Sequence, residues 1–141
     1  MSTVINAAPR AVWKAIEDVE SHVRWMDDAT AIRVTSRGHQ GVGTTFECDT
    51  RVGPLTLLDH MEITEWRPRR SMGVRHTGAV SGDGRFSLRS LGRDRTRFTW
   101  RERLVFPWWL GGSLGAAVGA EVLRAIWKRN LRNLKRIVEA P

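Results

Sequence analysis

Apolar and polar residues alternate through most of the chain between residues 30 and 106. The alternation is clearest in its last run, residues 97–106, where large apolar side chains and one glutamate share a face opposite arginines and a threonine. Turn-forming stretches interrupt it at residues 38–43, 52–54, 67–68, 78–84 and 92–94. A period of two with such interruptions is typical of β-strands joined by turns. The pattern therefore predicts about six successive strands in an antiparallel meander with one apolar face.

Before the meander, the pattern predicts one further strand and two short helices. The strand corresponds to the short apolar stretch at residues 3–5, and apolar residues at helical spacing predict a helix that begins near Pro9. The helical pattern weakens over residues 18–22, so the second helical turn is expected at residues 23–26.

After the meander, residues 114–138 predict one long helix. Its apolar stripe consists of Val118, Val122, Ile126, Leu131, Leu134 and Val138. The apolar face of the sheet needs a cover, and this helix is long enough to lie across it. The sequence thus predicts a single α+β domain over residues 1–141.

Composition and charge narrow the class of protein. The 141 residues are 41% hydrophobic, which is typical of a folded chain with a real core. The net charge of +8 raises the question of whether the protein binds nucleic acid. However, the basic residues are 20 Arg and 3 Lys, and they are scattered through nearly every segment. A protein that binds nucleic acid more often concentrates its positive charge on one face. The distribution argues against nucleic-acid binding.

The expected location is cytoplasmic. No apolar run approaches the roughly 20 residues that a membrane-spanning helix needs, and the N-terminus lacks the features of a signal peptide. The lone Cys48 cannot form an internal disulfide and is expected to behave as a small hydrophobic residue. The four histidines lie far apart in the sequence, and most of their side chains are expected to point away from the core, so no metal site is predicted. No nucleotide-binding glycine pattern is present. We expect no cofactor.

Four motifs, together with the order of elements, resemble the START-like (SRPBCC) superfamily of polyketide cyclase/dehydrase and lipid-transport relatives. They are Ile5-Asn-Ala-Ala-Pro9-Arg-Ala-Val-Trp13, Gly41-Val-Gly-Thr44, Glu65-Trp-Arg-Pro68-Arg-Arg70 and Asn130-Leu131-x-x-Leu134-Lys135. The resemblance covers essentially the whole chain. It implies the helix-grip fold, in which a curved antiparallel sheet of about seven strands wraps on a long C-terminal helix and encloses a cavity. The superfamily hosts carriers, receptors, cyclases and chaperone activators, so its fold does not specify an activity.

Three residues of the predicted apolar face are ionisable: Asp59, His76 and Glu102. A buried carboxylate without a partner is costly, so these side chains should meet each other, water or a ligand. Hairpins centred on the turns place Asp59 opposite His76, His76 opposite Gly84, and Gly84 opposite Glu102. The three side chains then form one cross-strand row, with His76 and Glu102 roughly 10 Å apart.

The sequence leaves three interpretations of this row open. In the first, Asp59 and Glu102 reach solvent or pair with arginines, and His76 is a core histidine with satisfied hydrogen bonds. In the second, the row orients the polar end of a mostly apolar ligand. In the third, the three residues are catalytic: His76, aligned by Asp59, is a general acid or base that acts on an enolisable carbonyl without a metal.

Apolar side chains of the strands and of the long helix are expected to line the cavity that the resemblance implies. The predicted ligand-binding residues are Trp25, Phe46, Cys48, Met61, Ile63, Val74, Phe86, Trp100, Trp109, Val118 and Val122. The stretch FPWWLGG at residues 106–112 ends the last strand at a proline. Its tryptophans either plug one end of the core or form an apolar rim, for which Gly111, Gly112 and Gly115 would provide a hinge.

The function expected from these observations is the binding, transport or sequestration of a small hydrophobic or amphipathic ligand. The alternative is a polyketide-type aromatase/cyclase or dehydratase that uses the same cavity, and the sequence leaves open whether the protein is an enzyme. The expected partner is the ligand itself. Transient contact with a membrane surface is compatible with the pattern, as are a monomer and a homodimer.

Overall fold

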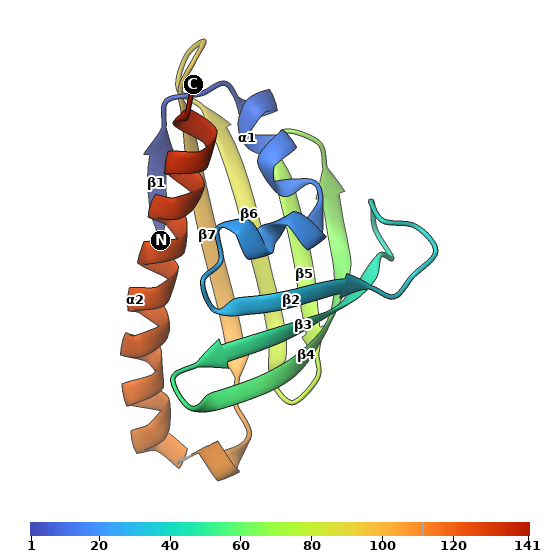
Figure 1. The fold of residues 1–141 in the computed structure, drawn as a ribbon, viewed down its shortest axis with the longest axis vertical. Helices are drawn as coiled ribbons and strands as arrows, with labels where there is room; N and C mark the ends of the chain where they lie inside the picture. Colours follow the sequence, from blue (N-terminus) through green and yellow to red (C-terminus); the bar gives the residue numbers. More distant parts are fainter. Residues whose placement is uncertain (111) are drawn as a thin grey trace.

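Seven strands form one curved antiparallel sheet, in the order β1-β7-β6-β5-β4-β3-β2 (Figure 1). The computed structural model describes residues 1–110 and 112–141. The strands are β1 (Ser2–Ile5), β2 (Ala29–Val34), β3 (Thr45–Val52), β4 (Leu55–Arg67), β5 (Ser71–Thr77), β6 (Ser81–Ser90) and β7 (Thr96–Val105). Strands β2 to β7 form the predicted meander, and β1 extends it at the β7 edge, where Thr3 lies opposite Phe98. Together with the long C-terminal helix, this architecture confirms the predicted helix-grip class.

The helices are α1 (Pro9–Ile16), the 3₁₀ helices η1 (Val19–Arg24) and η2 (Trp108–Leu110), and α2 (Gly112–Glu139). The second predicted helical turn is misplaced in the sequence-based prediction, because η1 begins within the stretch where the pattern weakens. The Asp18 side chain accepts a hydrogen bond from the Glu20 backbone N–H at 3.1 Å and so caps η1. Trp25 and Met26, which were expected inside this turn, follow its end.

The two halves of α2 pack differently, although Figure 1 shows one continuous helix along the sheet. In the second half, Leu131 and Leu134 are buried in the core with residues of β1, α1 and the strands. In the first half, Val118 and Val122 are 60% and 43% exposed. The apolar stripe of α2 is therefore packed solidly at one end and uncovered at the other.

Two asparagines of α2 fix its second half to the segment that precedes β2. The buried Asn130 accepts a hydrogen bond from the Asp27 backbone N–H at 3.0 Å and donates one to an Asp28 carboxylate oxygen at 2.7 Å. Asn133 donates to the Trp25 carbonyl at 3.2 Å. These bonds join residues about a hundred positions apart in the chain, so they define where the helix crosses the sheet.

Replacing Asn130 with alanine is expected to lower the free energy of unfolding by about 2 kcal/mol or more, because it leaves a backbone N–H and a carboxylate without their partner. Urea unfolding followed by tryptophan fluorescence measures the change. The exposed Asn6 offers a matched control, and Asn6→Ala is expected to stay within about 0.5 kcal/mol of the parent. Equal stabilities of the two variants would contradict the assignment.

Candidate functional site

A cavity of about 780 Å³ lies between the concave face of the sheet, η1 and the first half of α2. Its volume is typical of sites that hold small molecules. Its lining is mostly apolar and comes from every strand between β2 and β7 and from α2. The predicted residues on its wall are Phe46, Cys48, Met61, Val74, Phe86, Trp100, Val118 and Val122.

Two predicted lining residues belong to the solid core instead. Trp25 is buried among three rings, with ring centroids 5.1 Å from His22, 5.9 Å from Phe86 and 6.0 Å from Trp100. Ile63 is fully buried and belongs to the core cluster that also contains Trp13 and Ile16 of α1. Both residues face inward as predicted, but inward-facing positions at this end of the sheet are filled by packed side chains.

The mouth of the cavity lies where β7 ends. Trp108, with Phe106 and Pro107, is part of the lining and is 85% exposed, whereas Trp109 is half exposed and does not line the cavity. The prediction thus chose the wrong tryptophan of the pair. Gly111, predicted to provide part of a hinge, lies outside the described residues.

Asp59, His76 and Glu102 meet on the cavity wall and form what we call the acid–histidine cluster. The Nδ1 atom of His76 lies 2.6 Å from Oδ2 of Asp59, and its Nε2 atom lies 3.3 Å from Oε2 of Glu102. The first contact is a hydrogen bond, whereas the second has the distance of an ion pair without hydrogen-bond geometry. The histidine therefore lies between two carboxylates.

The register differs from the predicted one at two of three pairings. His76 lies opposite Met61 on β4 and opposite Gly82 on β6, so it is two positions away from Asp59 and Gly84. The turn between β4 and β5 spans residues 68–70, with Arg69 at a φ of 66°, and is longer than the assumed one, while a register irregularity in β4 between Ile63 and Glu65 takes back one position of the shift. The next turn is centred one residue earlier than assumed, because Thr77 lies opposite Ser81. A slip of two residues keeps side chains on the same face, so the cluster still forms.

The predicted gap of roughly 10 Å between His76 and Glu102 is wrong, and Gly84 is the reason. Gly84 lies opposite Glu102 on the intervening strand β6 and carries no side chain. A β-carbon there would lie 2.5 and 2.6 Å from the two carboxylate oxygens of Glu102. The carboxylate occupies this space, where one oxygen faces His76 and the other accepts a hydrogen bond from the Trp100 Nε1–H at 2.8 Å.

The variant Gly84→Ala is expected to displace the Glu102 carboxylate and to lower the pKa of His76, because the cation loses one of its two negative neighbours. Titration of the His76 ring protons by NMR measures the shift. In the control Gly38→Ala, the added methyl carbon would lie no closer than 3.9 Å to another atom, so the titration should not change. An unaltered His76 pKa in Gly84→Ala would contradict this role of Gly84.

The two carboxylates keep His76 protonated at neutral pH. Burial alone lowers the pKa of His76, but the hydrogen bond to Asp59 and the charge of Glu102 outweigh burial and raise it from 6.5 to about 9. The imidazolium is thus a buried cation held by its anionic neighbours.

We expect the free energy of unfolding to fall by on the order of 3 kcal/mol between pH 6.5 and pH 9.5. Because the pKa of His76 is higher in the folded state, its contribution is complete below the unfolded value of 6.5 and is lost as the pH rises through about 9. Urea unfolding across this range measures the change. The double variant Asp59→Asn/Glu102→Gln should show a much flatter profile, and an equally steep one would show that another group is responsible.

His22 and Asp28 also line the cavity, and sequence reasoning did not identify them as site residues. His22 was expected outside but is buried, and its Nε2–H donates to the Ile16 carbonyl at 2.7 Å. Burial lowers the pKa of His22 to about 4, so the ring is neutral. Its spacing of three residues from both Val19 and Trp25 on a helical segment was the signal that could have revealed its inward orientation.

Cys48 lies on the cavity wall but is a poor nucleophile. Burial raises the pKa of its thiol to about 11, so the thiolate is scarce at neutral pH. Within residues 1–110 and 112–141, no group of three or more His, Cys, Asp or Glu is arranged to hold a metal ion. None of the helices in this part of the chain has the length and apolar character that crossing a membrane requires.

The sequence matches the model of the family described as polyketide cyclase/dehydrase and lipid transport over residues 1–139. Similar solved structures include a Thermus thermophilus protein, with 18% identity, a TM-score of 0.77, and coverage of 98% of this chain and 94% of that chain. The Zhui aromatase/cyclase from a Streptomyces species has 17% identity, a TM-score of 0.77, and coverage of 99% and 91%.

A START superfamily protein from Mycobacterium smegmatis has 12% identity, a TM-score of 0.72, and coverage of 97% and 96%. No curated protein sequence matches the chain. At these identities the likenesses show a shared fold, and with the family match they confirm the resemblance that the motifs indicated.

Proposed function

The chain belongs to the polyketide cyclase/dehydrase and lipid transport family, and on this premise we propose that its cavity binds a small hydrophobic or amphipathic molecule. The observation that carries the proposal is a cavity of about 780 Å³ whose mostly apolar wall bears the acid–histidine cluster. Ligand sites commonly combine an apolar lining with a few placed polar groups that fix orientation. The apolar body of the ligand would contact side chains such as Phe46, Met61 and Val74, and its polar end would lie at the acid–histidine cluster.

The proposed route to the cavity is its mouth beside Trp108. This indole is almost fully exposed although it is large and apolar, and Val118 and Val122 on the facing side of the mouth are exposed as well. Exposed apolar groups around a concavity are typical of ligand grooves. An incoming hydrophobic molecule would cover them.

Titration with the neutral fluorescent probe N-phenyl-1-naphthylamine tests the proposal. We expect saturable binding with one probe per chain and displacement by dodecanol at concentrations below its solubility limit. Heat-unfolded protein provides the control for nonspecific adsorption. Absence of saturable binding, or binding that dodecanol does not reverse, would count against a ligand-binding cavity.

A second candidate function is a metal-free cyclase or dehydratase, and the 2.6 Å hydrogen bond between His76 and Asp59 favours it. The similar fold of an aromatase/cyclase is compatible with the same idea. Because the pKa of His76 is about 9, the ring would act at neutral pH as a general acid that donates a proton to a carbonyl oxygen of the substrate. The Glu102 carboxylate, whose Oε2 has no hydrogen-bond partner among the described residues, would accept the α-proton that the substrate loses.

Exchange of the α-protons of decan-2-one in D₂O, followed by NMR, tests this candidate. An enzyme of this kind should accelerate enolisation, and His76→Gln should abolish the acceleration while the ketone still displaces the fluorescent probe. If the parent protein binds the ketone without accelerating exchange, carrier function is favoured over catalysis.

A further inference from the structure

The charged groups on the cavity wall have a negative balance. Asp28, Asp59 and Glu102 contribute three carboxylates, and His76 contributes at most one positive charge, because His22 is neutral. Without Arg85, which is considered next, the described lining formally carries a net charge of −2 with His76 protonated and −3 with His76 neutral. The sign of the balance does not depend on the protonation state of His76.

Arg85 is the one further charged residue of the described lining, but its charged group points elsewhere. Its guanidinium forms a salt bridge with Glu65, with Nε 2.9 Å from a carboxylate oxygen, and the side chain is nearly half exposed. Glu65 neutralises this charge outside the cavity. Arg85 thus does not compensate the carboxylates of the interior.

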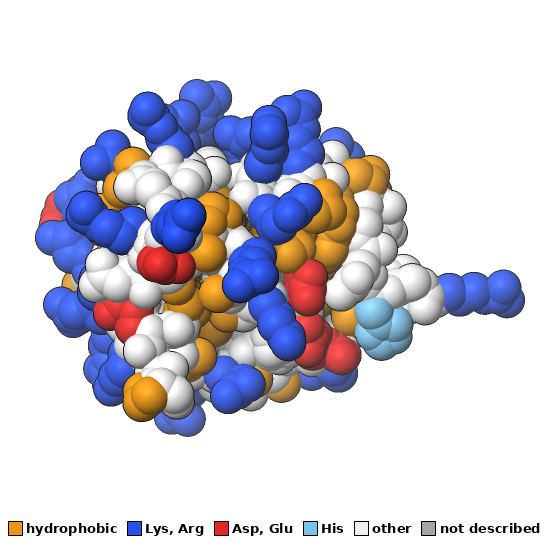
Figure 2. Space-filling model, turned by 90° about the horizontal axis from the view of Figure 1, so that it is seen from above, with side chains coloured by type: hydrophobic (Ala, Val, Ile, Leu, Met, Phe, Trp, Pro, Cys, Tyr) orange, Lys and Arg blue, Asp and Glu red, His pale blue; other side chains and the backbone are white. Residues whose placement is uncertain are grey.

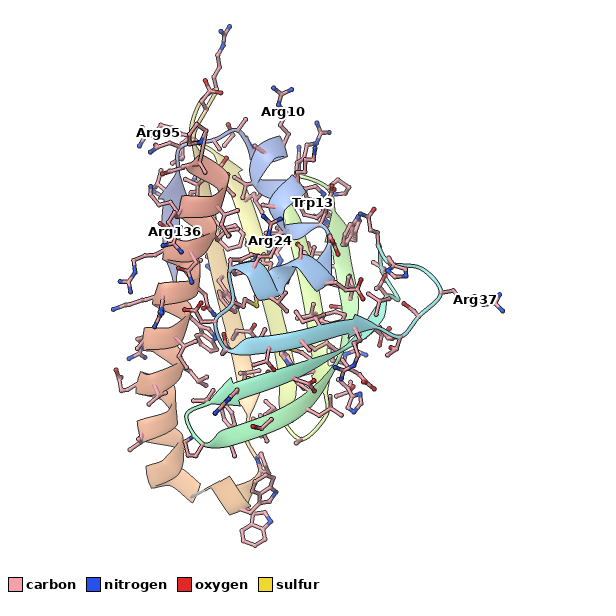
Figure 3. The ribbon with its side chains drawn as sticks, in the orientation of Figure 1. Arg10, Trp13, Arg24, Arg37, Arg95 and Arg136 are labelled. Atoms are coloured by element: carbon pink, nitrogen blue, oxygen red, sulfur yellow. The ribbon has the colours of Figure 1, made fainter. Side chains whose placement is uncertain are left out.

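The rest of the basic residues lie on the outer surface. Figure 2 shows lysines and arginines around the rim of the molecule when it is seen from above, and Figure 3 shows Arg10, Arg37, Arg95 and Arg136 pointing away from the sheet. The protein therefore combines a net charge of +8 with an anionic cavity. At physiological ionic strength, exposed charges farther than about 8 Å from the cavity are largely screened.

The acid–histidine cluster also has more hydrogen-bond acceptors than donors. Oε2 of Glu102 and Oδ1 of Asp59 are buried without a hydrogen-bond partner among the described residues, and the Glu102 and His76 side chains are each 9% exposed. His76 offers two N–H groups: one binds Asp59, and the other, on Nε2, also has no hydrogen-bond partner among the described residues, so two unpaired acceptors face one unpaired donor. A ligand group that donates hydrogen bonds would satisfy both oxygens, whereas a group that only accepts would pair with the one free N–H of His76 and leave both oxygens unsatisfied.

We infer that the preferred ligand is a hydrophobic amine, whose ammonium group binds at Asp59 and Glu102, and that the cavity discriminates against amphiphiles with a carboxylate head. The inference rests on the proposed function and specifies the chemistry of the ligand. An ammonium group supplies up to three donors and a positive charge, so it matches both the charge and the hydrogen-bonding needs of the wall. A carboxylate would enter a poorly solvated space beside like charges.

Displacement of N-phenyl-1-naphthylamine by dodecylamine, dodecanol and dodecanoate at pH 7 tests the inference, since the three differ only in their polar group. We expect the amine to bind at least about tenfold more tightly than the acid, a difference of 1.4 kcal/mol, with the alcohol between them. The positive surface would produce the opposite order, so adsorption outside the cavity cannot mimic this result. Equal displacement by all three, or a preference for dodecanoate, would overturn the inference and leave the proposed function intact.

The double variant Asp59→Asn/Glu102→Gln locates the origin of the preference. We expect the ratio of the amine's affinity to the acid's affinity to fall to about one in this variant, and circular dichroism would verify folding. If the double variant does not fold, the single variant Glu102→Gln provides the same comparison with a smaller expected change. A preference for the amine that persists in a folded variant would overturn the assignment to this cluster. Failure of all three amphiphiles and of the probe to bind the parent protein would refute the proposed function itself.

Discussion

The variant His76→Leu is expected to lower the free energy of unfolding by about 3–5 kcal/mol at pH 7, because it removes the buried cation between two buried carboxylates. The side chains of His76 and Glu102 are almost fully buried, and Asp59 lies within hydrogen-bonding distance of His76. Removing one partner of such a group leaves uncompensated charge in a poorly solvated space. Urea unfolding monitored by tryptophan fluorescence measures the loss.

Two comparisons make this experiment specific. The triple variant Asp59→Asn/His76→Leu/Glu102→Gln should recover a large part of the stability, because no ionised group then remains in the cluster. His60→Leu, on the exposed side of β4, should change stability by less than about 1 kcal/mol, because its ion pair with Glu47 is exposed. If His76→Leu proves as mild as His60→Leu, the cluster does not hold a protonated histidine.

The double variant Val118→Trp/Val122→Trp is expected to weaken binding of the fluorescent probe at least about tenfold without loss of stability. Both valines lie on the wall of the cavity but are exposed, so two indoles can fill space that no side chain now occupies. Filling empty apolar space adds dispersion contacts and leaves less volume for a guest. Isothermal titration calorimetry measures the affinity, and thermal unfolding measures stability.

The matched control places the same two indoles on the opposite side of the helix. Ala117 and Lys128 are exposed and do not line the cavity, so Ala117→Trp/Lys128→Trp should bind the probe like the parent protein. Equal affinities in the two double variants would mean that the probe binds outside the cavity beneath α2.

Alternation of apolar and polar residues was sufficient to predict the meander, the face that each strand turns inward, and the long helix. It also brought Asp59, His76 and Glu102 to one wall, because a strand that slips by two residues keeps its inward face. Their actual contacts could not be predicted, since these depend on the length of the turn before β5 and on the register irregularity between Ile63 and Glu65. They also depend on how far Glu102 reaches over the bare backbone at Gly84.

The lining of the cavity was predictable only where the alternation applies. Trp25 and Ile63 are inward-facing residues in the filled half of the molecule, and the sequence does not reveal where solid packing ends and empty space begins. Trp108 and Trp109 lie in an irregular segment, where no period indicates which indole turns toward the mouth. His22 escaped notice because η1 begins earlier than the pattern suggested.

The anchoring of α2 through its second half has a mechanical consequence for the size of the guest. The second half is held in place by the hydrogen bonds of Asn130 and by the buried side chains of Leu131 and Leu134. In contrast, residues 117–123 have mostly exposed side chains. Bending residues 117–123 away from the sheet would separate few packed side chains and would leave the sheet intact. If the cavity binds a ligand as proposed, we expect outward bending of residues 117–123, rather than opening of the sheet, to accommodate a guest larger than about 780 Å³.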